Sequence, residues 1–206
     1  KDQDAIVELA HHSDVITWEI EHIDSQHLIE LEEDGHDIQP SPETLHVVQD
    51  KLRQRQMLAG KVPVGSFFDL SEEMPVDSSG FVVKSRMGGY DGRGNLVVET
   101  LDDPAIEEQF GDTPIYAETK IDFQKEIAAI AARDWLGNVT IYPLVETVQK
   151  NNICHVTSSP AELDPAIEEQ SLEVVHATMG LLKGLGVFAI EMFVTNDGQV
   201  LVNEIA

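Results

Sequence analysis

The sequence predicts a chain that begins as an α/β unit and continues as an α+β body with mostly antiparallel strands. Two observations support this prediction. Near the start, a β-branched segment at residues 14–21 lies between two helical patterns, and a short apolar segment follows at Ile38. From residue 65 onward, short strand patterns follow one another, and an Asn-Asp-Gly turn at residues 196–198 closes a last hairpin.

Each expected element follows from a local signal. Ser41 and Pro42 mark the start of a helix that we expect to run to about Gly60, and Asp164-Pro165 marks another, closed by Gly184 and Gly186. Two earlier helices are expected at residues 3–12 and 25–33. Strands are expected at residues 14–21, 38–40, 80–85, 95–100, 114–121, 125–134, 138–148, 187–195 and 199–206.

The charge of the chain excludes some partners. Its 206 residues carry 38 Asp and Glu against 13 Lys and Arg, a formal net charge of −25. Such an acidic chain repels nucleic acid and anionic membrane surfaces, and no apolar segment is long enough to span a bilayer. The single cysteine, Cys154, has no partner for a disulfide, which favours a cytoplasmic protein. Because the chain starts at Lys1 and ends in a strand pattern, we expect a segment of a longer protein.

The most informative segment is Phe81-Val-Val-Lys-Ser-Arg-Met-Gly-Gly-Tyr-Asp-Gly-Arg-Gly-Asn-Leu-Val-Val98. Four glycines in seven residues let the backbone approach a ligand closely and offer amides to phosphate oxygens, while Lys84 and Arg93 add positive charge. A dinucleotide fingerprint would need a helix after the glycines, but a strand pattern follows. The segment therefore predicts a flap that closes over phosphates, with a plain glycine-rich turn as the alternative.

A pair of carboxylates forms the second candidate site. If Asp197-Gly198 is a two-residue loop, the register of the hairpin places Glu191 opposite Glu204, with their Cβ atoms about 5 Å apart. Opposed carboxylates destabilise a sheet unless a cation neutralises them, and oxygen ligands suit magnesium or manganese. The alternative is two solvated acids on a very acidic surface, and a longer loop would shift the register.

Other candidates rest on weaker signals. Lys51 lies within a predicted helix, where a lysine is usually only solvated, and Glu118 and Glu126 lie on neighbouring strands, where they could accept hydrogen bonds from a base or a ribose. Glu19 and Glu21 share one strand face at a carboxyl end, where open α/β sheets bind ligands.

Taken in order, the segments Glu19-Ile-Glu21, Gln39-Pro-Ser-Pro42, Gln49-Asp-Lys51, the glycine-rich segment, Tyr142-Pro-Leu-Val-Glu146 and Val202-Asn-Glu-Ile-Ala206 resemble the 5-(carboxyamino)imidazole ribonucleotide synthase family. The resemblance covers essentially the whole chain. It implies an ATP-grasp fold, preceded by part of a parallel α/β domain like the N-terminal domain of biotin carboxylase. The domains would be residues 1–42 and 43–206, with a mobile lid at about 62–121.

The resemblance also implies an activity: joining of bicarbonate to aminoimidazole ribonucleotide with ATP and Mg²⁺ or Mn²⁺, through carboxyphosphate, by a homodimer. Glu19, Tyr90 and Asp91 would meet the ribonucleotide, and Arg93 would act in the reaction with the two metal-binding acids. The implied nucleotide and metal contacts are Lys51, Lys84, Gly89, Tyr90, Asp91, Gly92, Arg93, Gly94, Asn95, Glu118, Thr119, Lys120, Ile121, Glu126, Glu191, Asn203 and Glu204.

Three alternatives remain open. Another ATP-grasp ligase, such as a formate-dependent glycinamide ribonucleotide transformylase or a biotin carboxylase, would keep the glycines but not the Tyr90-Asp91 pair. A non-catalytic nucleotide-binding module would be expected to lose the carboxylate pair first. A purely structural acidic domain leaves the glycine-rich segment unexplained.

Overall fold

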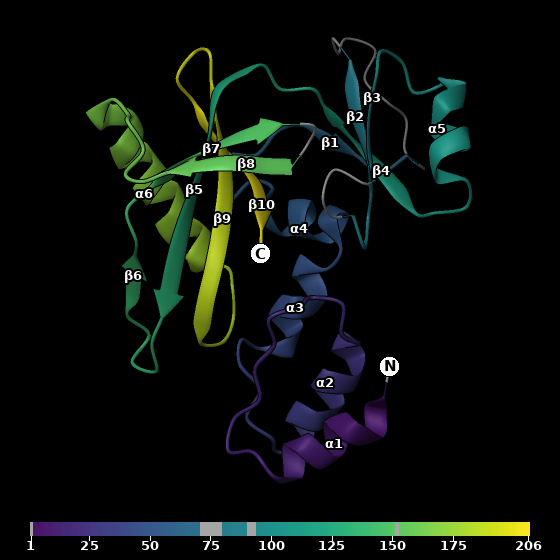
Figure 1. The fold of residues 1–206 in the computed structure, drawn as a ribbon, viewed down its shortest axis with the longest axis vertical. Helices are drawn as coiled ribbons and strands as arrows, with labels where there is room; N and C mark the ends of the chain where they lie inside the picture. Colours follow the sequence, from purple (N-terminus) through teal and green to yellow (C-terminus); the bar gives the residue numbers. More distant parts are fainter. Residues whose placement is uncertain (1, 71–79, 90–93, 151–152) are drawn as a thin grey trace.

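The computed structural model describes residues 2–70, 80–89, 94–150 and 153–206. Figure 1 shows three parts: helices α1 to α3 at one end of the molecule, a small sheet at the upper right and a larger sheet at the left. Each part has its own cluster of buried apolar side chains. Helix α4 and the C-terminus lie between them.

The N-terminal part packs α1 (Gln3–His11), α2 (Ser25–Glu33) and α3 (Pro42–Val48) around a small core that includes Leu28 and Ile38. The expected strands at residues 14–21 and 38–40 are reduced to a single parallel bridge between Ile16 and Ile38. Two strands without further neighbours are marginally stable, which accounts for their short extent.

The helix expected from residue 42 to about 60 is instead two helices. Helix α3 ends at Val48, and α4 (Lys51–Leu58) begins after Asp50, whose carboxylate accepts hydrogen bonds from the amides of Leu52 and Arg53. Asp50 is a good N-cap because it satisfies amides that have no partner in the first turn. Lys51 is therefore the first residue of a helix and not an interior one.

The small sheet has the order β1-β4-β2-β3 and lies within the expected lid. Its strands are β1 (Phe67–Phe68), β2 (Phe81–Ser85), β3 (Asn95–Val98) and β4 (Ile115–Thr119). β2 and β3 are antiparallel and pair Lys84 with Asn95, as expected for a hairpin. The helix α5 (Pro104–Phe110) was not predicted, although Asp103-Pro104 carries the same start signal as Asp164-Pro165.

The large sheet has the order β10-β9-β5-β7-β8, with β6 paired to β5. The pattern at residues 138–148 divides into β6 and β7 around Pro143, and β8 was not predicted. Helix α6 (Pro165–Met179) packs on this sheet and ends before Gly180, its C-cap, which is earlier than expected. The strands are β5 (Phe123–Arg133), β6 (Val139–Ile141), β7 (Val145–Lys150), β8 (Ile153–Ser158), β9 (Gly186–Thr195) and β10 (Val200–Ile205).

The last hairpin confirms the predicted pairing of Glu191 with Glu204, but with a different loop length and a register shift. Its loop has three residues, because Thr195 and Gln199 pair across it, so Val202 lies opposite Met192. An irregularity at Asn203 then shifts the register by one residue and brings Glu204 opposite Glu191. The longer loop alone would have separated the two acids, and the bulge restores their pairing. Within the described residues, no helix has the length and apolar character needed to cross a membrane.

Candidate active site

A cavity of about 1330 Å³ lies where the three parts of the molecule meet. Its walls come from the loop at residues 21–26, the start of α4, strands β2 and β4 of the small sheet, and strands β5, β9 and β10 of the large one. A cavity of this size is ample for a nucleotide and part of a second substrate.

The cavity collects most of the residues that sequence analysis singled out. Gly94 is described but does not line it: a Cβ at this position, where φ is 99°, would lie 2.4 Å from Ser85 Oγ, so this glycine serves the closure of the hairpin. Tyr90, Asp91, Gly92 and Arg93 lie outside the described residues. The predicted residues that do line the cavity are Lys51, Lys84, Gly89, Asn95, Glu118, Thr119, Lys120, Ile121, Glu126, Glu191, Asn203 and Glu204.

At the N-terminal end of the cavity the structure favours a different acid from the predicted one. Glu19 is exposed and does not line the cavity, whereas Glu21 does. The Gln49 side-chain amide donates hydrogen bonds to the carbonyls of Glu21 and Ile23, which holds this loop against the cavity. Burial raises the pKa of Glu21, the charge of Glu204 raises it further, and Lys51 opposes both effects. The strand face that Glu19 and Glu21 were expected to share does not form, because residues 17–21 are not a strand, and the role of Glu19 implied by the resemblance stays a prediction.

The carboxylate pair lies on the wall formed by the large sheet. Lys51 Nζ donates to Glu204 Oε1 over 2.6 Å, while Asn203 Nδ2 lies 3.5 Å from Glu191 Oε2. Glu191 is open to the cavity but partly enclosed by protein. This desolvation raises its pKa, and the charges of Glu204 and Glu126 raise it further. The Lys51 charge and the Asn203 hydrogen bond lower the pKa of Glu191 but do not cancel these effects.

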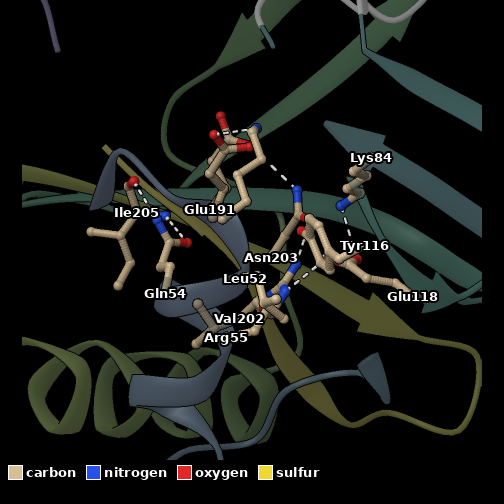
Figure 2. Close-up of polar contacts among 12 residues, drawn as sticks. Leu52, Gln54, Arg55, Lys84, Tyr116, Glu118, Glu191, Val202, Asn203 and Ile205 are labelled. Carbon is tan, nitrogen blue, oxygen red and sulfur yellow. Dashed lines mark hydrogen bonds and ion pairs between the residues drawn. The ribbon is translucent and has the colours of Figure 1, made fainter. Parts of the chain in front are cut away.

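The opposite wall contains a buried ionic cluster (Figure 2), which we call the Glu118 cluster and define as Arg55, Lys84, Tyr116 and Glu118. Glu118 Oε1 accepts from Arg55 Nε over 2.7 Å and from the Tyr116 hydroxyl over 2.6 Å, and Oε2 accepts from Lys84 Nζ over 2.8 Å. Burial would raise the pKa of Glu118, but the charges of Lys84 and Arg55 and their hydrogen bonds lower it to about 2.

This cluster corrects the interpretation of Glu118 and adds a residue. Both carboxylate oxygens of Glu118 have protein partners, so it holds Lys84 at the cavity and is not a free acceptor for a base or ribose. Arg55 was missed, because an arginine in the middle of a helical pattern is normally expected at the surface. Only the packing of α4 between the two sheets buries its side chain, which is 4% exposed.

The site can hold an anionic ligand together with a divalent cation. Lys51 and Lys84 bring positive charge to the cavity, and Glu191, Glu204 and Asn203 offer hard oxygen donors beside it. Among the described residues, no three His, Cys, Asp or Glu side chains gather as a metal site, so further ligands would have to come from a bound nucleotide or water. The donors fit Mg²⁺ or Mn²⁺, since such an ion would relieve the repulsion between Glu191 and Glu204.

Comparison with known proteins places this geometry in a family. The model of the ATP-grasp domain matches residues 62–206, and that of the ribonucleotide synthetase preATP-grasp domain matches residues 1–49. A phosphoribosylaminoimidazole carboxylase of Schizosaccharomyces pombe is 38% identical over 214 aligned residues, which cover 100% of this chain and 39% of that protein.

Solved structures show the same similarity. The carboxyaminoimidazole ribonucleotide synthase of Aspergillus clavatus complexed with ATP has a TM-score of 0.91 and 34% identity, over 100% of this chain and 56% of that one. The same fungus's N5-carboxyaminoimidazole synthase in complex with ADP and 5-aminoimidazole ribonucleotide has a TM-score of 0.89 and 32% identity, with the same coverage. This chain thus spans about two fifths to just over half the length of these relatives. With its match to the ATP-grasp model over residues 62–206 and a nucleotide-sized cavity between two sheets, the chain belongs to the ATP-grasp family.

Proposed function

We propose that the protein carrying this chain joins bicarbonate to the amine of 5-aminoimidazole ribonucleotide, using ATP with Mg²⁺ or Mn²⁺. One observation carries the proposal: Lys51, Lys84 and the Glu191–Glu204 pair line one cavity that also reaches Glu21. The likeness to a structure that holds ADP and 5-aminoimidazole ribonucleotide supports the substrate assignment.

The proposed reaction has two steps. A bicarbonate oxygen attacks the γ-phosphorus of ATP, the bond from that phosphorus to the bridging oxygen breaks, and ADP leaves, giving carboxyphosphate. The amine of the ribonucleotide then attacks the carboxyl carbon, phosphate leaves, and the amine loses a proton to form the carbamate. Both steps move negative charge, so fixed cations and exclusion of water are the expected contributions of the protein.

The described residues divide these tasks. Lys84, held by Glu118, would neutralise phosphate oxygens from the side of the small sheet, and Lys51 would do so from the first turn of α4. Glu191 and Glu204, with Asn203 beside them, would hold the divalent ion, which when bound neutralises the phosphates. Glu21, in place of Glu19, is the acid we propose to face the ribonucleotide. Thr119, Lys120, Ile121 and Glu126 would surround the base and ribose.

The remaining expectations stay predictions. These are the domain boundaries at residues 1–42 and 43–206, the lid motion of residues 62–121, the homodimer and the cytoplasmic location. The roles of Tyr90, Asp91 and Arg93 also stay predictions.

Substrate-dependent ATP hydrolysis by the complete protein tests the proposal. We expect slow release of ADP with ATP and Mg²⁺ alone, and much faster release when 5-aminoimidazole ribonucleotide and bicarbonate are both present. Equal stimulation by glycinamide ribonucleotide with formate would instead assign the protein to the transformylases. Calorimetry of ADP with and without Mg²⁺ separates a catalyst of either kind from a passive nucleotide-binding module.

A further inference from the structure

Arg55 contacts both sheets at once. Its Nε donates to Glu118 on β4 over 2.7 Å, its Nη1 donates to the carbonyl of Val202 on β10 over 2.8 Å, and its Nη2 lies 3.3 Å from Asn203 Oδ1. Figure 2 shows this side chain between Glu118 on one side and Val202 and Asn203 of β10 on the other. The three contacts use the planar fork of a guanidinium, which a lysine ammonium cannot reproduce.

The contacts of Arg55 continue on both sides into the site. On the side of the small sheet, Glu118 also accepts a hydrogen bond from Lys84 Nζ over 2.8 Å. On the side of the large sheet, Asn203 lies 3.5 Å from Glu191. A continuous series of polar contacts therefore joins the lysine offered to phosphate with the carboxylate offered to the metal.

Arg55 also acts where the backbone of β10 is irregular. Asn203 is the bulged residue whose insertion brings Glu204 opposite Glu191. Arg55 holds the Val202 carbonyl before the bulge, and the neighbouring Gln54 amide bonds both the amide and the carbonyl of Ile205 after it, each over 3.0 Å. β10 is the edge strand of the large sheet and forms an isolated bridge to Val64 at Val202, and these side chains bond further backbone groups of its outer edge on both sides of the bulge.

The charges are consistent with this role. Glu118 lies between Arg55 and Lys84, so one buried carboxylate faces two cations and leaves one positive charge in excess at the cavity. Without Arg55, Glu118 and Lys84 would form a neutral pair, and less positive charge would be offered to a phosphate.

We infer that Arg55 is a positioning residue that fixes Lys84 relative to Glu191 and Glu204, so that a nucleotide and its divalent ion are bound together in one geometry. The inference rests on the proposed binding of a metal-nucleotide complex, but not on the identity of the second substrate.

Two variants of the complete protein test this role, Arg55→Lys and Arg55→Met. A control exists in Arg133, an arginine that is less buried than Arg55 and whose Nη1 donates to the carbonyls of Leu182 and Gly184 over 2.8 and 3.1 Å, away from the cavity. Arg133→Lys and Arg133→Met remove a comparable set of hydrogen bonds, so they report the effect of lost stability alone.

The first measurement is calorimetry of ADP at several Mg²⁺ concentrations, with thermal unfolding recorded for every variant. We expect both Arg55 variants to lose affinity for ADP by about 10- to 100-fold in the presence of Mg²⁺, as when an outer-shell partner of a metal site is removed. Without Mg²⁺ the loss should be smaller. The Mg²⁺ concentration for half-maximal ATP turnover should rise by a similar factor, while the Arg133 variants change neither quantity.

An Arg55→Lys protein that binds ADP and Mg²⁺ as tightly as the Arg133→Lys protein would overturn the inference. If Arg55→Met does not fold, Arg55→Lys decides, together with Arg55→Ala supplied with millimolar guanidinium, which should regain part of its affinity for ADP with Mg²⁺. A failure of aminoimidazole ribonucleotide to stimulate hydrolysis would remove the proposed substrate and leave these binding results standing.

Discussion

Two carboxylates on opposite walls of the cavity differ in how their charge is balanced. Glu118 is buried against Arg55, Lys84 and Tyr116, and its pKa is lowered to about 2. Glu191 faces Glu204 across the hairpin, the Asn203 amide lies 3.5 Å from it, and the pKa of Glu191 is raised although the Lys51 charge opposes the shift. The protein's own cations compensate the charge of Glu118, and we propose that a bound cation compensates that of Glu191, because an opposed pair of acids is costly without one. Glu118 therefore stabilises the structure of the site, whereas we propose that Glu191 binds a ligand in it.

The largest expected effect comes from the uncompensated wall. Glu204→Gln should lower ATP turnover by more than about 100-fold, since loss of a divalent ion removes several kcal/mol of charge stabilisation. Steady-state kinetics measure it, with circular dichroism to show that the fold is intact. The control is Glu43→Gln, whose ion pair with Lys183 lies at the exposed surface and should leave turnover unchanged. Full activity of Glu204→Gln would remove the metal-binding role.

On the compensated wall the effect should be on stability. Glu118→Gln leaves Arg55 and Lys84 buried without their carboxylate, which should cost about 3–5 kcal/mol of unfolding free energy. Urea unfolding measures it. Glu43→Gln, which breaks only a surface ion pair, should cost less than about 1 kcal/mol. Equal losses in the two variants would mean that the Glu118 cluster contributes no more than a surface contact.

The pH dependence of the unfolding free energy tests the lowered pKa of Glu118. The pKa of Glu118 falls from 4.5 to about 2 on folding, so the unfolded chain binds the proton first as the pH drops. The stabilisation from this group is complete above pH 4.5 and is lost as the pH falls toward 2. Subtracting the unfolding free energies of Glu118→Gln from those of the original chain isolates this contribution. A difference that does not change across this pH range would contradict the lowered pKa.

The smallest expected effect is a gain. Because the pKa of Glu191 is raised on folding, its charge destabilises the metal-free fold at neutral pH, and this cost vanishes as the pH falls toward the ordinary value of 4.5. Glu191→Gln should therefore slightly raise the melting temperature at pH 7 without divalent ions. Mg²⁺ with ADP should then stabilise the original chain but not the variant. A lower melting temperature for Glu191→Gln would show that the pair is already balanced within the protein.

Most of the residues that sequence reasoning singled out, and that the structure describes, line the cavity, but their contacts with one another were not predicted. The pairing of Glu191 with Glu204 was predicted from a two-residue loop, yet it depends on a three-residue loop and a bulge at Asn203 that compensate each other. Glu19 and Glu21 were expected to share one strand face because alternation presumes a strand, and only Ile16 forms a bridge in that segment. Such errors arise where a local rule depends on a neighbouring element that the local pattern does not show.

By itself the sequence determined the hairpin at residues 196–198, the helix starts at Pro42 and Pro165, and several of the charged residues that line the cavity, since turn residues, caps and periodicity act over a few residues. Only the tertiary structure decided which charges meet. Lys51 bonds Glu204 and Arg55 bonds Asn203, partners 153 and 148 residues apart along the chain. The burial that fixes Arg55 and lowers the pKa of Glu118 exists only once α4 is packed between two sheets, because desolvation depends on everything that surrounds a group.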